Sequence, residues 1–259
     1  MKSTFRLAAG ILGGTLLQAG AFQRDFSPDR PDVTDGAVTV EPGVWQVETG
    51  LFEFDKDKSG GVTSRTWTFA QTNFKYGVTQ LDDVEFIVSP WVEDSSRGLG
   101  MKTHDEGFGD VTLRWKHNFW GNDGGDSSFG VIPFVNIPTQ TAVSTGEWEG
   151  GVILPVAFQL TKGIDLSCEV ALNRVWDSDS GAHHWDFLHS ASLGFDLTDS
   201  LGAYIEYIGI AGDAPFQVIG SAGFTWKQSE RLQWDLGVMV GLTKSAPDFS
   251  ITQGVSFRF

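Results

Sequence analysis

The chain of 259 residues has 33 acidic and 18 basic residues, which gives a formal net charge of −15 at pH 7. This balance disfavours a nucleic-acid partner, because contact with phosphates needs a basic surface. The single cysteine, Cys168, excludes an internal disulfide. Beyond the N-terminal stretch, no segment has the roughly 18 apolar residues that a membrane-spanning helix requires.

The chain begins with the features of a secretory signal peptide. Lys2 and Arg6 precede a short apolar run at 7–17, and Ala19 and Ala21 form a small-residue cleavage site. The apolar run is too short to cross a bilayer as a helix, which disfavours a retained anchor. We therefore predict a signal peptide over residues 1–21 and export of the remaining chain.

Residues 22–43 are rich in Asp and Pro and show no strand alternation. If the strands that follow form a barrel, two placements are open for this segment. It folds into the lumen as a plug, where Arg30 pairs with an inner carboxylate, or it forms a periplasmic leader.

Residues 44–259 alternate apolar and polar side chains with a period of two, which predicts strands. About twelve such runs occur, each near the length of a tilted membrane strand. They are expected at 44–54, 65–76, 82–92, 107–119, 127–137, 151–161, 164–175, 185–197, 201–210, 216–227, 231–242 and 248–259.

The connections alternate in length as they do in outer-membrane barrels, which have short periplasmic turns and longer outer loops. The longer and more acidic connections are expected at 55–64, 93–106, 138–150 and 176–184. An even strand number lets the sheet close with both termini on one side. The pattern thus predicts an all-β fold, an antiparallel up-and-down transmembrane β-barrel over residues 44–259.

Aromatic side chains gather near the predicted strand ends, as expected for two interfacial girdles. The set expected on the periplasmic side is Trp45, Phe74, Tyr76, Phe119, Trp120, Phe257 and Phe259, and the other set is Phe54, Trp67, Trp91, Trp176 and Trp185. A soluble β-sandwich with a Trp-rich core is the alternative. The many Gly and charged residues on the other face suit a wet lumen better.

The last strand alternates up to the terminal residue, Phe259. Chain ends usually fray, whereas the last strand of a barrel must pair with the first to remove the sheet edge. The terminal Phe also resembles the C-terminal signal read by the barrel-assembly machinery, which implies that machinery as a partner.

If the apolar rows face lipid, the charged side chains of the strands line the lumen. A Lys or Arg facing lipid at the midplane would cost roughly 2–4 kcal/mol. These charges either form a selectivity lining or make salt bridges across the interior that fill it. The predicted inner residues are Glu48, Glu85, Arg114, Lys116, Asp165, Glu169, Asp196, Glu206, Lys227, Asp235 and Arg258.

The sequence offers no catalytic constellation. A barrel hydrolase needs a Ser and a His on one face, but His189 and Ser190 are adjacent and point to opposite faces. His183 and His184 lie among acidic residues and are interpreted as exposed side chains rather than metal ligands. We expect no catalytic residue, metal or cofactor.

Four stretches have distinctive motifs, at 29–54, 107–121, 133–139 and 246–259. The residues of an N-terminal motif and a G-x-G-D motif are Arg30, Pro31, Asp32, Thr34, Asp35, Pro42, Gly43, Gln46, Glu48, Gly107, Gly109 and Asp110. Together these stretches resemble a known family of outer-membrane transporters, named for the MetA-pathway of phenol degradation. Gln140 stands where the family often has Gly after its Pro-Thr pair, which puts the role of that loop in question.

The resemblance implies a transporter-like barrel in the outer membrane, in contact with outer-membrane lipid and lipopolysaccharide. The hypothesis for function is passive passage of small solutes, with aromatic or hydrophobic compounds as a candidate class. The alternatives are a non-transporting structural or interaction barrel and, less favoured, a barrel enzyme.

Overall fold

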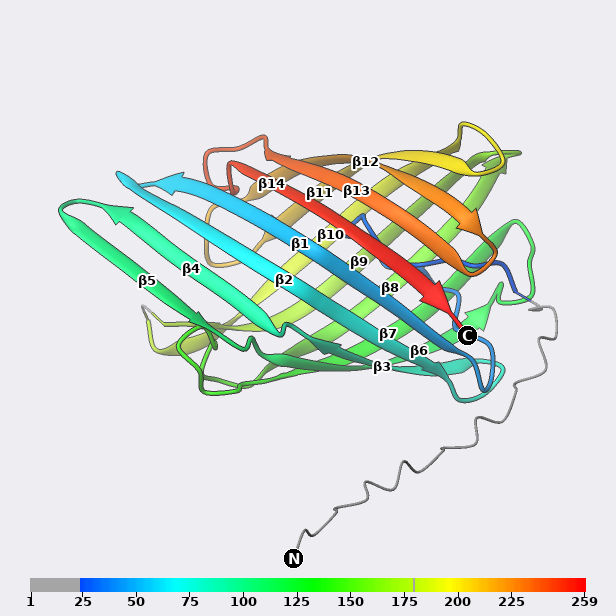
Figure 1. Ribbon diagram of the computed structural model, residues 1–259, viewed down its shortest axis with the longest axis horizontal. Coiled ribbons are helices and arrows are strands. Elements are labelled where there is room, and N and C mark those ends of the chain that lie inside the picture. The colour runs from blue at the N-terminus through cyan, green and yellow to red at the C-terminus, as the bar shows by residue number, and fades with distance from the viewer. Residues whose placement is uncertain (1–23, 179) are drawn as a thin grey trace, which may run out of the picture.

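The computed structural model describes residues 24–178 and 180–259, so the predicted signal peptide lies outside the described residues. No helix in these two ranges is long and apolar enough to cross a membrane. Their strands form one antiparallel sheet that curls round and closes through the pairing of β1 with β2 (Figure 1). In chain order the strands are β1 (Trp45–Ser59), β2 (Val62–Gly77), β3 (Asp82–Val88), β4 (Trp91–Gly98), β5 (Met101–Gly107), β6 (Val111–Trp120), β7 (Ser127–Ile137), β8 (Glu149–Thr161), β9 (Ile164–Asp177), β10 (Ala182–Asp196), β11 (Leu201–Ala211), β12 (Gln217–Ser229), β13 (Leu232–Gly241) and β14 (Phe249–Arg258).

The wall has 12 positions although 14 strand segments are described. One half of β2 pairs with β3 and the other half with β4. In the same way β6 pairs with β3, and β5 pairs with β4. The segments β3 and β4 therefore form one broken strand and occupy one position, and β5 and β6 form a second broken strand beside it. The predicted closed 12-strand antiparallel barrel is thus confirmed.

The two broken strands are interrupted side by side. Pro90 lies between β3 and β4 and has no backbone N–H for the ladder. Between β5 and β6, the Gly109 N–H donates to the carbonyl oxygen of Ser89 at 2.9 Å. A Cβ at Gly109 would lie 2.9 Å from the Cβ of Ser89, so this close approach requires Gly. The continuous strands predicted at 82–92 and 107–119 were wrong at these breaks.

Two of the predicted outer loops are strands instead. β1 and β2 continue to a tight turn at Gly60 and Gly61, both with positive φ, and residues 93–106 form most of the β4–β5 hairpin. Beyond the membrane both faces of a sheet meet water, so the apolar–polar contrast disappears while the backbone pairing continues. The loops predicted at 55–64 and 93–106 were wrong for this reason.

The chain end closes the barrel as the alternation predicted. Trp45 N–H donates to the Phe259 carbonyl at 3.0 Å, and Phe259 N–H donates to the Trp45 carbonyl at 2.9 Å. Val47 lies opposite Phe257 in the β1–β14 ladder. The backbone groups of Trp45 and Phe259 therefore have hydrogen-bond partners at this seam, where an open sheet would have a free edge.

Apolar side chains cover the outer face, and polar side chains are buried inside. Trp115, Ile205 and Phe224 are among the exposed apolar residues of the outside. By contrast, Lys75 and Lys116 are among the largest fully buried side chains of the chain. Such an inverted distribution requires that the buried charges have partners in the interior.

Candidate functional site

The N-terminal segment, residues 24–43, runs inside the barrel (Figure 1). Its groups bond to side chains from walls on all sides, which only a segment in the lumen can reach. Arg24 donates to Thr39 Oγ1 at 3.2 Å and to the Gln80 carbonyl in the β2–β3 turn at 2.7 Å. Both arms of the segment therefore meet at the end that holds the C-terminus, and the residues between them project into the lumen.

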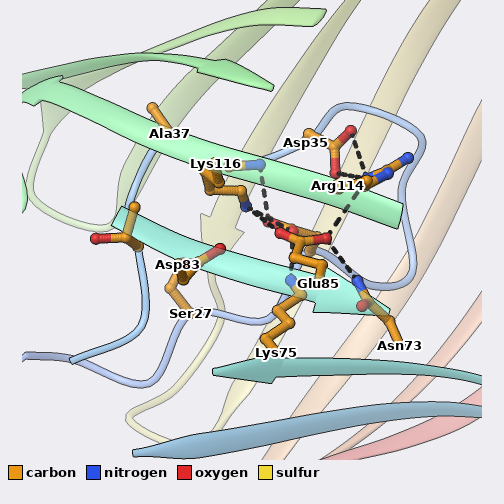
Figure 2. Close-up of polar contacts among 12 residues, drawn as sticks. Ser27, Asp35, Ala37, Asn73, Lys75, Asp83, Glu85, Arg114 and Lys116 are labelled. Carbon is orange, nitrogen blue, oxygen red and sulfur yellow. Dashed lines mark hydrogen bonds and ion pairs between the residues drawn. The ribbon is translucent and has the colours of Figure 1, made fainter. Parts of the chain in front are cut away.

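A cluster of buried charges forms around Asp29 of this segment. Figure 2 shows three of its members, Lys75, Glu85 and Lys116. The Asp29 carboxylate pairs with Lys75 of β2 and lies 2.8 Å from Lys116 Nζ of β6. Lys75 Nζ also lies 2.5 Å from Glu48 Oε1, and Lys116 Nζ lies 3.4 Å from Glu85 Oε1. The two lysines thus form ion pairs with three carboxylates, one of them from the segment.

Deeper along the segment, Thr34 and Asp35 contact the opposite walls. The Thr34 hydroxyl lies 2.7 Å from Glu206 Oε1 of β11, and the Asp35 N–H donates to Glu169 Oε2 of β9 at 2.7 Å. Arg114 Nη1 of β6 donates to Asp35 Oδ1 at 2.9 Å. These two residues therefore join three separate parts of the wall.

Arg30 anchors the segment to the wall near the closing seam. Its Nη2 donates to Asp235 Oδ1 of β13 at 3.0 Å and to Thr252 Oγ1 of β14 at 2.8 Å. A Cβ at Gly254 would lie 2.5 Å from Arg30 Nε, and one at Gly50 would lie 3.0 Å from Arg30 Nη1. Small residues on the inner face thus leave the space that the guanidinium occupies.

Most of the charged residues predicted for the lumen lie buried on the inner face near the segment. Arg258 Nη1 donates to the Arg24 carbonyl at 2.8 Å. Lys227, Asp165 and Asp196 instead line a cavity near the periplasmic end, where all three are largely exposed. The predicted residues in contact with the segment are Glu48, Arg114, Lys116, Glu169, Glu206, Asp235 and Arg258, whereas Glu85 contacts Arg114 and Lys116.

Sequence reasoning missed Lys75, Asp83 and Asp29. Lys75 lies between Phe74 and Tyr76, so strand alternation already placed it inside. Asp83, whose Oδ2 accepts from the Val40 N–H at 2.8 Å, follows the same rule in β3. Asp29 lies in no strand, and periodicity gives no signal for such a residue.

Two cavities lie on either side of residues 30–32. One, of about 240 Å³, has Glu53, Gln71 and Met239 in its wall. The other, of about 210 Å³, lies toward the periplasmic turns and is lined by Ser167 and Lys227 among others. Arg30, Pro31 and Asp32 belong to both walls, so this stretch separates the two spaces.

One side of the lumen is apolar rather than charged. Ile132, Ile153 and Ala171, from β7, β8 and β9, form a buried cluster against which Phe134 and Leu188 pack. The Arg114 guanidinium lies 5.9 Å from the Phe134 ring centroid, at the border between the apolar and charged walls. The interior therefore offers both kinds of surface to a solute.

Asp110 of the G-x-G-D motif holds the loop at 138–148. Its Oδ1 accepts from the Thr139 N–H and its Oδ2 from the Thr145 N–H, both at 2.9 Å. Partial burial acts to raise the pKa of Asp110, but hydrogen bonds from Ser144, Thr139 and Thr145 outweigh it and hold the pKa below its usual value. Gln140 has a φ of 61°, a left-handed conformation that Gly adopts without strain.

His189 and Ser190, which were considered as a catalytic pair, have different partners in the structure. His189 Nε2 lies 3.3 Å from Tyr207 Oη, whereas the Ser190 hydroxyl lies 2.6 Å from Thr34 Oγ1. Within the part of the chain that the structure describes, no group of three or more His, Cys, Asp or Glu residues could hold a metal ion.

The fold is that of outer-membrane β-barrels. The crystal structure of the COG4313 outer membrane channel from Pseudomonas putida F1 matches with a TM-score of 0.66 at 13% identity, over 88% of this chain and 100% of that one. The translocator domain of the autotransporter NalP from Neisseria meningitidis matches at 0.54 with 11% identity, over 85% and 90% of the chains. The NanC porin matches at 0.51 with 8% identity, over 82% and 98%.

A family model described as "Putative MetA-pathway of phenol degradation" matches residues 28–259. The chain therefore belongs to this family, as the motifs predicted. A search of the curated proteins gave no match.

Proposed function

We propose that the barrel is a passive channel for small solutes, and that aromatic or hydrophobic compounds are among them. The observation that carries this proposal is the pair of cavities on either side of residues 30–32. Together they extend from the periplasmic turns to the middle of the lumen. Only a thin stretch of the N-terminal segment separates them.

The two kinds of lumen wall support an amphipathic solute. Arg114 and Asn73 line the 240 Å³ cavity together with Ile87 and Met239. Polar groups in a cavity orient a ligand, while apolar side chains contribute affinity for its rings or chains. A solute with an aromatic body and one polar group fits this division.

The N-terminal segment would act as the plug of this channel. It supplies Arg30, Pro31 and Asp32 to the partition and is held by side chains of several strands. These bonds are all non-covalent, so a partial release would join the two cavities without a change in the barrel wall.

The direct test is ion conductance in planar bilayers, together with uptake of phenol-sized solutes by proteoliposomes. The full mature chain should give small conductance steps, and a variant lacking residues 22–43 should give larger ones. A correctly folded barrel with neither conductance nor solute flux, even after this deletion, contradicts the proposal.

A non-transporting barrel is the second candidate, and the buried charge cluster around Asp29 favours it. Lys75 and Lys116, both fully buried, hold the segment through ion pairs with Asp29, as a permanent core would. The deletion separates the candidates, because a structural core predicts that loss of residues 22–43 destabilises the barrel without any gain of selective flux.

We infer export with cleavage after Ala21, insertion by the barrel-assembly machinery, contact with lipopolysaccharide, and no enzymatic activity. Pulse labelling of cells would show a precursor longer than the mature protein by the predicted peptide, and an unprocessed protein would contradict the export step.

A further inference from the structure

The outer extension of β1, β2, β4 and β5 carries positive charge on its lipid-side face. In β1 and β2, Phe54 pairs with Trp67, and their rings lie 4.5 Å apart on the outside of the barrel. Side chains two residues further along a strand share the same face. This rule places Lys56, Lys58 and Arg65 beyond these rings, on the same outer face.

The same face continues across β4 and β5. Phe69 pairs with Trp91, and both are exposed on the outside. Every second residue of β4 from Trp91 onward faces outward, which places Arg97 on this face, opposite Thr63. Lys102 of β5 lies opposite Arg97 and therefore shares this face. We define the basic patch as Lys56, Lys58, Arg65, Arg97 and Lys102.

The basic patch lacks an internal counter-charge. Lys56 lies directly opposite Arg65, and Arg97 lies directly opposite Lys102, which are unfavourable cross-strand pairs of like charge. Among the described residues, no ion pair includes any of the five. In a chain of net charge −15, such a concentration of unpaired basic residues indicates an external anion.

The acidic residues of this region do not neutralise the patch. Asp55, Asp57 and Asp94 are offset by one residue and therefore face the inner side of the sheet, where Asp94 Oδ1 accepts from Thr66 Oγ1 at 2.6 Å. On the outer face, Glu93 and Glu106 lie on either side of His104, at 3.7 and 3.8 Å. This acidic pair lies nearer the membrane than the patch.

A hollow in the patch is shaped for a small anionic group. It has a volume of about 340 Å³, and its walls include Arg65, Arg97 and Lys102 together with the hydroxyl residues Thr63 and Ser95. Guanidinium and hydroxyl groups donate the charge-assisted hydrogen bonds that phosphate oxygens accept. All of these side chains come from paired strands, which hold them in a fixed register.

The distance of the basic patch from the membrane interface indicates which anion it binds. The basic residues begin two positions beyond the aromatic rings, roughly 7 Å along the strand. Aromatic side chains mark the membrane interface, and basic clusters just beyond it recognise anionic lipid headgroups. On the outer leaflet of an outer membrane, the phosphorylated headgroup at this height belongs to the lipid A of lipopolysaccharide.

We propose that the basic patch is a binding site for the phosphates of lipopolysaccharide, centred on Arg65 and Arg97. The site deepens the proposed contact with lipopolysaccharide and rests on the outer-membrane location, but not on solute passage. Bound lipid would neutralise the like-charged cross-strand pairs and fix the protruding β4–β5 hairpin against the membrane surface.

The test is a titration of fluorescent rough-type lipopolysaccharide with the full mature barrel in neutral detergent micelles. The variant Arg65→Gln/Arg97→Gln should lose affinity by about tenfold or more, because two lipid-facing charges are removed. The matched control, Lys162→Gln/Lys244→Gln, changes the net charge equally in turns outside the patch and should bind as the unaltered chain does. Arg65→Lys/Arg97→Lys should retain most of the affinity.

Two further arms identify the ligand. Dephosphorylated lipopolysaccharide should bind the unaltered chain as weakly as the Gln variant binds the intact lipid. Equal affinity for both forms, or no difference between the Gln variant and the control, overturns the proposal. Equal affinity for phosphatidylglycerol also overturns it, because the patch would then recognise any anionic headgroup. Conductance in phosphatidylcholine bilayers should not change in the Gln variant, which separates this result from the proposed channel activity.

Discussion

Arg30 and Asp235 join the N-terminal segment to the barrel wall although they are 205 residues apart in the chain. Their Nη2 and Oδ1 atoms lie 3.0 Å apart, and the Asp235 side chain is fully buried. A buried carboxylate of this kind depends on its cationic partner, because an unpaired charge in the interior is costly. An intact Arg30–Asp235 ion pair therefore indicates that this part of the N-terminal segment is bound to the barrel wall.

Substitution of Arg30 by Ala should release this part of the segment. Loss of one partner of a buried ion pair costs about 3 kcal/mol, which corresponds to roughly a hundredfold shift in an equilibrium between seated and released states. We expect more frequent and larger conductance steps in planar bilayers. Arg174→Ala removes an exposed arginine elsewhere and should leave the conductance unchanged. Unaltered conductance in Arg30→Ala, with increased conductance after deletion of residues 22–43, would show that Arg30 does not seat the plug.

Substitution of Lys116 by Met tests the charge cluster around Asp29. Lys116 Nζ lies within 2.8 Å of Asp29 and 3.4 Å of Glu85, and its side chain is almost fully buried. The free energy of unfolding should fall by about 3–5 kcal/mol, because two buried carboxylates lose a partner. Urea unfolding in lipid vesicles, followed by tryptophan fluorescence, measures this change. Lys162→Met, in an exposed turn, should stay within about 0.5 kcal/mol of the unaltered chain, and an equal loss in both variants would contradict the cluster's role.

The sequence allowed the wall to be predicted far better than its contents. Alternation placed Glu85 and Lys116 inside and Trp115 outside, because each strand residue has only two possible faces. It could not place Asp29 or Arg30, whose segment follows no period and is positioned by single bonds to distant strands. It also missed the extension that holds Lys56 and Arg65, since both sheet faces there are polar and hydropathy no longer distinguishes strand from loop.

Asp110 should control the order of the loop at 138–148. Asp110→Asn leaves an amide that carries no charge and offers one acceptor oxygen in place of two, so the N–H groups of Thr139 and Thr145 cannot both keep their partner. We expect faster amide exchange at residues 139–145, measured by mass spectrometry at pH 7, with unchanged exchange in the strands. Ser144→Ala removes the hydroxyl that bonds to Asp110 and accepts from the Gly146 N–H, but it keeps the carboxylate with its bonds to Thr139 and Thr145, so it should have a smaller effect.

The pH dependence of this loop follows from the lowered pKa of Asp110. Because the folded-state pKa lies below the unfolded value of about 4, the carboxylate stabilises the loop at pH values above that value and loses this effect as the pH falls through the folded pKa. The difference in loop exchange between the unaltered chain and Asp110→Asn should therefore narrow below about pH 4. A difference that stays constant down to pH 2 would show that the charge of Asp110 contributes nothing.

Phe259 has a backbone role and a side-chain role that two variants separate. Deletion of Phe259 removes both hydrogen bonds to Trp45 and should lower the free energy of unfolding in pure lipid vesicles by about 1–3 kcal/mol. Phe259→Ala keeps the backbone and loses only a half-exposed ring that stacks on Phe257 at 6.1 Å, so its stability in vesicles should change by less than about 1 kcal/mol. If the terminal Phe is also the signal for assembly, Phe259→Ala should still reduce the amount of folded barrel in cells, measured by heat-modifiable mobility on gels. Normal assembly of Phe259→Ala in cells would leave closure of the seam as the function of this residue.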